Sequence, residues 1–275
     1  MENFMTCNLL MCPLSTRGEV DTRTLQIVAD TSNQLWEEHA DWWIEGFTDG
    51  ADPEYEEQIL PLAAHELAGA RRVLDIGCGD GQVSRLAAAN GAEDDVTVIG
   101  IDPTWNCLTV ASERGGGPAY GRAAAAALPF ANESFDTAVA CLVFEHIDDV
   151  DDAIAEVARV LELGGRFCFF LNHPILQTPD AGWINDHTVD PPEQYWRMGP
   201  YLVESATIEQ VQKDVFIRFI HRPMSRYVNA LAEHGLVIER MLEPSPPPGF
   251  LAISEQYESA AAFPRLLYLR LRKIR

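Results

Sequence analysis

The chain has 275 residues, of which 47% are hydrophobic, and this apolar content is enough for a large core and excludes global disorder. Its 42 acidic residues against 20 basic ones give a formal net charge of -22, which disfavours nucleic acid and anionic lipid as partners. No apolar run in the sequence is long enough to span a bilayer.

The N-terminal part of the chain divides into two predicted segments. Residues 1–20 have no basic residue before their mildly apolar stretch, so they do not have the form of a signal peptide, and we expect a disordered extension. Residues 21–68 are expected to form a helical cap. Within it, an aromatic-rich helix is predicted over 33–44 and a second helix over 54–67.

Strand and helix patterns alternate through the middle of the chain. Strands are predicted over 71–76, 96–101, 135–140 and 166–171. Helices are predicted over 83–90, 104–114 and from 150 onward, with Gly91 capping the first and Gly164-Gly165 ending the last. Because the strands are apolar on nearly every residue, helices should cover both faces. The pattern therefore predicts a doubly wound α/β fold with a mostly parallel sheet.

The last third of the chain has a different pattern. Residues 172–222 are irregular, with aromatic residues among prolines and glycines, and we place an aromatic-rich insert after the fifth strand, at about 174–222. A helix over 225–234 follows. Strands over 236–242 and 266–274 then form a hairpin-like pair at the far end of the sheet.

Six cysteines are present without CxxC or CxxH spacing, namely Cys7, Cys12, Cys78, Cys107, Cys141 and Cys168. We expect reduced thiols, a cytoplasmic location and no metal site.

The most informative motif is the glycine-rich turn that follows the first predicted strand, Asp75-Ile76-Gly77-Cys78-Gly79-Asp80-Gly81. Glycines let the backbone approach a ligand closely, and the free amides at the helix start favour a negative group. A dinucleotide loop needs its third glycine at position 82, where this chain has Gln82. With no diphosphate to hold, Asp75 can face a ligand's ammonium group. The turn therefore disfavours an NAD-dependent oxidoreductase, which stays the alternative interpretation.

Asp102 ends the second predicted strand and has two interpretations. A carboxylate at this place can accept two hydrogen bonds from the hydroxyls of a ribose. The next residue, Pro103, is a good first helical residue, so Asp102 can also cap the following helix. We favour ribose binding because of the glycine turn upstream.

Together with later motifs, these elements resemble the class I S-adenosylmethionine-dependent methyltransferases, in the branch that methylates quinone rings, sterols and small natural products. The later motifs are Ala127-Leu128-Pro129-Phe130 ahead of Ser134-Phe135-Asp136, then Phe144-Glu145-His146-Ile147, then Leu163-Gly164-Gly165. The resemblance covers residues 70–173. It implies a seven-stranded Rossmann-like sheet, a methyltransferase domain over 69–275, S-adenosylmethionine as cofactor, and a small, partly apolar methyl acceptor.

The resemblance also implies roles for individual residues. It places the methionyl part of the cofactor on the glycine turn, the ribose on Asp102, and the adenine on the stretch before Leu128. The expected cofactor-binding residues are Asp75, Gly77, Cys78, Gly79, Gly81, Asp102, Pro103, Ala126, Ala127, Leu128, Cys141, Leu142 and His146. Ala124 stands where the family often has an Asp that binds the adenine amine, so backbone groups or a water must take that role.

Catalysis of methyl transfer depends mainly on alignment and the exclusion of water, because positive charge disappears as the reaction proceeds. A general base helps when the acceptor is a hydroxyl or an acidic carbon. His173, after the fifth strand, is the first candidate, and His146 is a weaker one; each can instead have a structural role. His187 and His221 are further candidates. A non-catalytic S-adenosylmethionine-binding protein is the second alternative, and a homodimer is left open.

Overall fold

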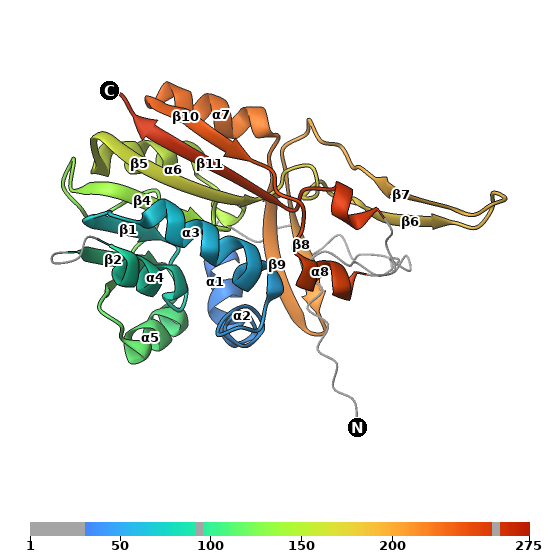
Figure 1. Ribbon diagram of the computed structural model, residues 1–275, viewed down its shortest axis with the longest axis horizontal. Coiled ribbons are helices and arrows are strands. Elements are labelled where there is room, and N and C mark those ends of the chain that lie inside the picture. Colours follow the sequence, from blue (N-terminus) through green and yellow to red (C-terminus); the bar gives the residue numbers. More distant parts are fainter. Residues whose placement is uncertain (1–30, 92–95, 255–258) are drawn as a thin grey trace.

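The computed structural model describes residues 31–91, 96–254 and 259–275 (Figure 1). The extension expected over 1–20 lies outside these ranges. The first described elements are the helices α1 (Thr31–Glu38) and α2 (Ala40–Phe47), which are separated at His39. A π-helical turn, η2 (Tyr55–Ile59), then continues into α3 (Leu60–Leu67). Pro61 in the first turn of α3 has no N–H for an α-helical bond, in keeping with the irregular turn before it.

A seven-stranded sheet forms the centre of the molecule. Its strands are β1 (Arg72–Ile76), β2 (Thr97–Asp102), β3 (Ala119–Arg122), β4 (Phe135–Cys141), β5 (Leu161–Asn172), β10 (Leu236–Leu242) and β11 (Leu266–Lys273). The connecting helices are α4 (Gln82–Asn90), α5 (Trp105–Arg114), α6 (Val150–Val160) and α7 (Met224–Glu233). The α/β fold with a mostly parallel seven-stranded sheet, expected from the sequence, is confirmed. The short strand β3 was not predicted, because its four residues contain a glycine and an arginine and carry little apolar signal.

The strand order β10-β11-β5-β4-β1-β2-β3 places β1 at the point where the chain changes direction across the sheet. Strands β2 and β3 lie on one side of β1, and β4 and β5 lie on the other, all parallel to it. β11 runs antiparallel to both β5 and β10, which confirms the predicted pairing of the last two strands. In open α/β sheets a ligand crevice forms at such a point, outside the carboxyl ends of the strands.

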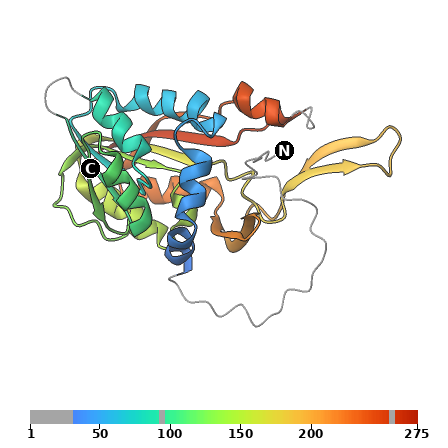
Figure 2. The same ribbon diagram turned by 90° about the horizontal axis from the view of Figure 1, so that it is seen from below.

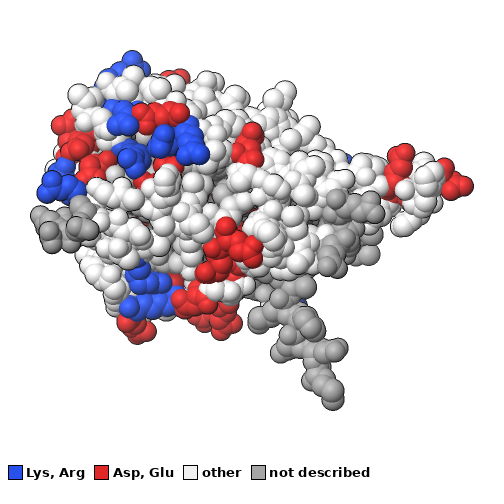
Figure 3. Space-filling model, in the orientation of Figure 1, with Lys and Arg blue, Asp and Glu red and all other residues white. Residues whose placement is uncertain are grey.

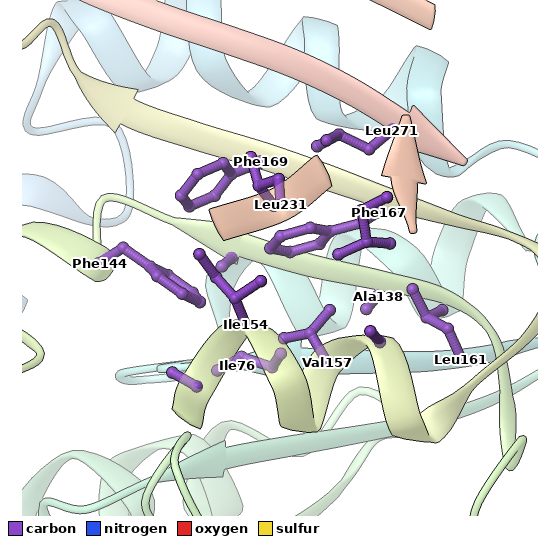
Figure 4. Packing of buried hydrophobic residues seen from close by; sticks show 14 of the residues in the cluster. Ile76, Ala138, Phe144, Ile154, Val157, Leu161, Phe167, Phe169, Leu231 and Leu271 are labelled. Carbon is purple, nitrogen blue, oxygen red and sulfur yellow. The ribbon is translucent and has the colours of Figure 1, made fainter. Parts of the chain in front are cut away.

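Alternation along each strand divides the core into two layers. Leu74 and Ile76 of β1 pack on the face covered by α6 and α7, whereas Val73 packs on the face covered by α2, α3 and α4. β5 divides in the same way, with Phe167 and Phe169 under α6 and α7. Figure 4 shows these two rings beside Ile154 and Val157 of α6. Because both faces are covered, the inner strands are apolar at consecutive positions.

The insert after β5 contains two antiparallel hairpins outside the main sheet. They are β6 (Gly182–Asp186) with β7 (Glu193–Arg197), and β8 (Ser205–Gln212) with β9 (Val215–His221). The β6–β7 hairpin projects away from the rest of the molecule in both ribbon views (Figures 1 and 2). The irregular structure expected over 172–222 is therefore wrong in part, because the prolines and glycines of this region lie largely between the strands.

Of two predictions of helix ends, one is confirmed and one is wrong. Gly91 is the C-cap of α4, as expected, with an extended backbone (φ -69°). Gly164-Gly165 was expected to end α6, but that helix ends at Val160 and the two glycines lie inside β5. A further short helix, α8 (Pro248–Ile253), and the 3-10 turns η3 (Phe144–His146) and η4 (Ala260–Ala262) complete the described elements.

Charged side chains of both signs mix on the face shown in Figure 3, and acidic residues lie at the tip of the β6–β7 arm. Several of the basic residues form ion pairs, for example Arg272 and Arg270 with Glu239. Over the described residues, none of the helices has the length and apolar character needed to cross a membrane.

Candidate functional site

The glycine turn after β1 is tied to the end of β2. The backbone amides of Gly77 and Cys78 both donate to the carbonyl of Ile101, at 2.8 and 2.9 Å. Gly77 has φ +69°, and a side chain there would place its Cβ 2.5 Å from a methyl group of Val143. The turn therefore needs glycine at this position for two reasons, its left-handed backbone and its close approach to the segment after β4.

Asp102 holds the same turn through its side chain. One carboxylate oxygen accepts from the amide of Gly79 at 3.0 Å, and the other accepts from the amide and hydroxyl of Thr104 (2.8 Å for the amide). The N-cap of α5 is Thr104, so the alternative of Asp102 as the N-cap is wrong. A carboxylate has about four lone-pair sites, so these three bonds leave acceptor capacity on Asp102.

Asp75 lies deeper, at the carboxyl end of β1, and is only 1% exposed. The hydroxyl of Ser84 donates to it at 2.6 Å. Burial, together with the neighbouring carboxylates Asp102 and Asp80, raises the pKa of Asp75 to about 7 against the lowering effect of the Ser84 bond. An ammonium group beside it would favour the ionised form.

These residues line one cavity of about 220 Å³. Of the residues expected to bind the cofactor, those on its wall are Asp75, Gly77, Cys78, Gly79, Asp102, Pro103, Ala126, Cys141, Leu142 and His146. Gly81, Ala127 and Leu128 are not on the wall. Gly81 is the N-cap of α4 and packs under Tyr120, and Leu128 is buried in the core with its amide donating to Glu156 at 2.7 Å. The alanine run instead contributes its earlier members, residues 123–125.

The N-terminal helices supply a part of the wall that lies outside the residues expected to bind the cofactor. Trp36 and Trp43 belong to it, as does Tyr55, and the indole nitrogen of Trp43 is 3.5 Å from where a Cβ on Gly79 would stand. Trp43 thus lies over the glycine turn. The density of tryptophan between residues 33 and 44 was the available signal, but the sequence alone does not say which face of these helices the rings occupy.

A second cavity of about 50 Å³ adjoins the first. Both cavities are lined by Trp36, Trp43, Tyr55, Leu142 and His146. The remaining wall of the second cavity is formed by Trp42, Phe47, Asp52, Pro53, Glu54, Gln58, Ile59, Asn172, Phe219, Phe250, Ile253, Arg265 and Leu266. Aromatic rings thus dominate this cavity, and its charges are partly paired.

Arg265 is the cation on the wall of the second cavity, and it is held on two sides. Its guanidinium forms a bidentate pair with Glu54, with both distances 2.7 Å. It also lies 3.9 Å from the centre of the Phe250 ring. The arrangement neutralises the arginine and fixes one edge of the aromatic wall.

His146 stands between the two cavities with one ring nitrogen engaged. Its Nδ1 is 2.8 Å from the carbonyl of Arg218, and because a carbonyl only accepts, Nδ1 carries the proton. Burial lowers the pKa of His146 to about 4, so the ring is neutral and Nε2 has a free lone pair. The part of the chain that the structure describes gives Nε2 no hydrogen-bond partner. Trp36 and Phe219 contact the ring, at 5.0 and 4.9 Å between centroids.

The other candidate histidines lie elsewhere. His173 is 4% exposed and is absent from the walls of both cavities. Its Nε2 is 2.7 Å from a carboxylate oxygen of Glu243, and its Nδ1 accepts from the amide of Ile175 at 3.2 Å. His221 is buried against the carbonyl of Tyr201, and His187 lies in the turn between β6 and β7. The geometry therefore favours His146 over His173 as a group that can meet a ligand.

The thiols near the site are buried and protonated. The described cysteines Cys78, Cys107, Cys141 and Cys168 are free, and burial raises the pKa of Cys107 and of Cys168 to about 12. Cys7 and Cys12 lie outside the described residues. Over residues 31–91, 96–254 and 259–275, no group of three or more His, Cys, Asp or Glu side chains is placed to hold a metal ion.

The fold, the glycine turn after β1 and the carboxylate at the end of β2 resemble those of methyltransferase domains that use S-adenosylmethionine. Residues 74–169 match the family model described as a methyltransferase domain. A crystal structure of an S-adenosylmethionine-dependent methyltransferase from Mesorhizobium loti is 28% identical, with a TM-score of 0.67 that covers 81% of this chain and all of that one.

Two curated relatives match part of the chain. A demethylmenaquinone methyltransferase from Thermobifida fusca is 33% identical over 121 residues, which cover 42% of this chain and 50% of the relative. A ubiquinone biosynthesis O-methyltransferase from Agrobacterium fabrum is 38% identical over 106 residues, 37% of this chain and 41% of the relative. The chain thus spans half or less of the length of these relatives.

Proposed function

We propose that this protein transfers a methyl group from S-adenosylmethionine to a small, planar, partly apolar acceptor, with a hydroxylated aromatic ring as the favoured class. One observation carries the proposal: the glycine turn and Asp102 line a cavity that adjoins a second cavity walled by aromatic rings, and His146 lines both cavities. The ring-shaped acceptor is brought to this chain from the relatives whose names refer to demethylmenaquinone and ubiquinone biosynthesis.

The residues of the first cavity fit the cofactor. Asp75 offers a carboxylate to the methionyl ammonium, Asp102 keeps acceptor capacity for the ribose hydroxyls, and residues 123–126 offer small side chains beside a flat base. Pro103, Cys141 and Leu142 complete the proposed contacts. We propose that Gly81 shapes the turn without lining the cavity, and that Ala127 and Leu128 lie behind the cavity wall. When bound, the cofactor supplies an electrophilic methyl group on a positively charged sulfur.

The second cavity is proposed to receive the acceptor. Its volume of about 50 Å³ is smaller than a ring requires, since a benzene-sized ligand occupies a cavity of roughly 150 Å³. Side chains of the N-terminal helices and of α8 must therefore move when the acceptor enters. Their return over the bound ring excludes water, which strengthens the alignment on which the reaction depends.

His146 is the proposed general base for a hydroxyl acceptor. Its neutral ring presents an unprotonated Nε2 at the passage between the cavities, where the acceptor oxygen must meet the methyl group. Such a base contributes roughly 100- to 10,000-fold. His173 is proposed to be structural, because both of its ring nitrogens are occupied and it lies outside both cavities.

The test separates cofactor binding from chemistry. Calorimetry should detect S-adenosylhomocysteine binding to the wild-type protein and no binding of NAD. Transfer of tritiated methyl groups is then measured to a panel of catechols, hydroquinones and aliphatic alcohols of similar size. His146→Gln should keep the affinity for S-adenosylhomocysteine and lower transfer to phenolic acceptors. Binding without transfer to any ring acceptor would support the non-catalytic alternative, and absence of binding would defeat the proposal.

We extend the proposal to the protein's organisation and surroundings. Residues 69–275 would form the methyltransferase domain and residues 21–68 its cap. The net charge of -22 supports the absence of a nucleic-acid partner, and the free thiols of the described cysteines support a cytoplasmic location. A homodimer stays a prediction that sedimentation measures.

A further inference from the structure

Three segments far apart in the sequence meet at His146. In α1, Ser32 donates its hydroxyl to the backbone carbonyl of His146 at 3.0 Å, and Trp36 contacts the ring. From the insert, β9 places the carbonyl of Arg218 on Nδ1 and the ring of Phe219 against the imidazole. The third segment is η3 itself, which carries the histidine.

The strand β9 is outside the main sheet, so its position against η3 depends on other contacts. It pairs only with β8 in the described structure, and it contacts α1 and η3. The guanidinium of Arg218 forms a bidentate ion pair with Asp148, two residues beyond His146, at 2.8 and 2.6 Å. Bidentate pairs fix orientation as well as distance. The Arg218 side chain thus holds the strand whose own carbonyl meets the histidine.

A second arginine strengthens this attachment just after β9. Arg222 is 2% exposed and donates to three backbone carbonyls around η3, those of Phe144 at 3.1 Å, Ile147 at 2.8 Å and Asp148 at 3.0 Å. The two arginines therefore attach the insert to the loop on both sides of His146. Arg222 keeps the loop in place, whereas Arg218 sets the carbonyl that faces Nδ1.

We propose that Arg218 is a positioning residue: its ion pair with Asp148 holds its backbone carbonyl on Nδ1 of His146, so that the proton stays on Nδ1 and Nε2 faces the acceptor. The inference rests on the proposed function for its catalytic consequence, but the position of the proton can be measured without any reaction. In the absence of this carbonyl, a neutral imidazole distributes its proton between both nitrogens. Only the form with a free Nε2 can accept a proton at the passage between the cavities.

Other charged groups around His146 would act on its titration, and they must be unchanged in a valid test. The titratable groups that line the two cavities with it or neighbour it in the chain are Asp52, Glu54, Tyr55, Asp75, Cys78, Asp80, Asp102, Cys107, Cys141, Glu145, Asp148, Asp149 and Arg265. Glu145 is buried and accepts from Asn172, so it is held away from the ring by its own bonds. Arg218 is the charged side chain whose removal changes both the field at the ring and the strand's position.

The experiment compares two arginines that form the same kind of pair. Arg218→Gln removes the pair with Asp148. Arg226→Gln is the matched control, because it removes a bidentate pair between α7 and Asp151 of α6, and a longer contact with Glu204 at 3.5 Å, and neither partner contacts His146. Arg218→Lys keeps the charge with fewer hydrogen bonds, and Asp148→Asn breaks the same pair from the other side. The nitrogen shifts of ¹⁵N-labelled histidine report the tautomer, and the His146→Gln spectrum assigns the signal.

We expect the His146 ring to be a mixture of the two tautomers in Arg218→Gln and in Asp148→Asn. The share of the Nδ1–H tautomer should be intermediate in Arg218→Lys and the same as in the wild type in Arg226→Gln. Because kcat scales with the fraction of the competent form, a fall of that fraction to about one tenth lowers kcat about tenfold. The KM for the cofactor should stay constant in Arg218→Gln. The acid limb of the kcat–pH profile should move to higher pH, because a loosened strand exposes the ring to water.

Retention of the single Nδ1–H tautomer in both Arg218→Gln and Asp148→Asn would overturn the inference, as would equal kcat losses in Arg218→Gln and Arg226→Gln. Failure of the wild-type protein to bind S-adenosylhomocysteine would defeat the proposed function instead. The tautomer measurement would still decide the positioning role in that case.

Discussion

Replacing Asp102 with alanine tests a residue that both stabilises the glycine turn and is proposed to bind the ribose of the cofactor. The carboxylate has three hydrogen bonds within the protein, from the amide of Gly79 and from the amide and hydroxyl of Thr104. The substitution removes these bonds together with the proposed acceptor for the ribose. Two quantities should therefore change, the affinity for the cofactor and the free energy of unfolding.

The magnitudes follow from the number and kind of bonds. Hydrogen bonds to a charged group contribute about 1.5–3 kcal/mol, so loss of the ribose contact should raise the dissociation constant of S-adenosylhomocysteine about 10- to 150-fold. Loss of the three internal bonds should lower the free energy of unfolding by about 1–3 kcal/mol. The stability loss is offset in part because burial raises the pKa of Asp102, which means that the native protein pays for an ionised carboxylate there.

A carboxylate at the other end of the strands, away from the cavity, provides the control. Asp136 of β4 accepts from the amides of Arg71 and Arg72 at the start of β1, with 2.8 Å for Arg72. Asp136→Ala should therefore lose stability without losing affinity. Calorimetry gives the dissociation constants and urea unfolding gives the stabilities. If Asp102→Ala binds S-adenosylhomocysteine within about twofold of the wild type, the carboxylate only shapes the turn and the ribose assignment is wrong.

Three other predictions follow from the geometry. Gly81→Ala should lower the free energy of unfolding by about 1–3 kcal/mol in urea, because a Cβ at φ +83° would stand 2.7 Å from the ring carbon of Tyr120 that bears the hydroxyl; an unchanged stability would mean that the tyrosine moves freely. Asp75 has a folded-state pKa of about 7 against an ordinary 3.8, so the folded protein binds the extra proton and stability falls as pH rises through that window. Asp75→Asn should therefore gain stability over the wild type by up to about 4 kcal/mol at pH 7.5 and little at pH 4, and a constant difference between the two would contradict the shifted pKa. His173→Gln should change kcat less than about twofold in the tritium assay, since a base contributes far more than that; a loss of 100-fold would restore it as the base.

The inner strands of the sheet could be predicted because each of them is covered by side chains on both faces. Val73 and Leu74 pack on opposite faces, so a strand with both faces covered shows an unbroken apolar run, and such runs are visible in sequence. The hairpins of the insert follow a different rule. In β7 the burial alternates along Glu193–Arg197, but polar residues fill many of its positions and the prolines before it suggested a loop. Partly exposed pairs carry too little apolar contrast to be recognised.

The candidate site was predictable where backbone geometry requires a residue type. Gly77 and Gly79 have positive φ, and Asp102 follows a buried strand, so each has a local signal. The ranking of His173 above His146 had no such basis, because it depended on distance from the strand end alone. The contact of His146 with Arg218 joins residues 72 positions apart, and only the folded chain brings them together.

The hairpin insert can therefore be exchanged in evolution, or by an engineer, as a separate module. The glycine turn and Asp102 belong to the main sheet and its first turn, whereas the carbonyl on His146 comes from β9, which shares no ladder with that sheet. Lengthening or replacing the hairpins would alter acceptor choice and base strength together while the nucleoside end stays intact. Chimeras with foreign inserts should accordingly inherit their donor's acceptor preference and keep this chain's affinity for the adenosyl group.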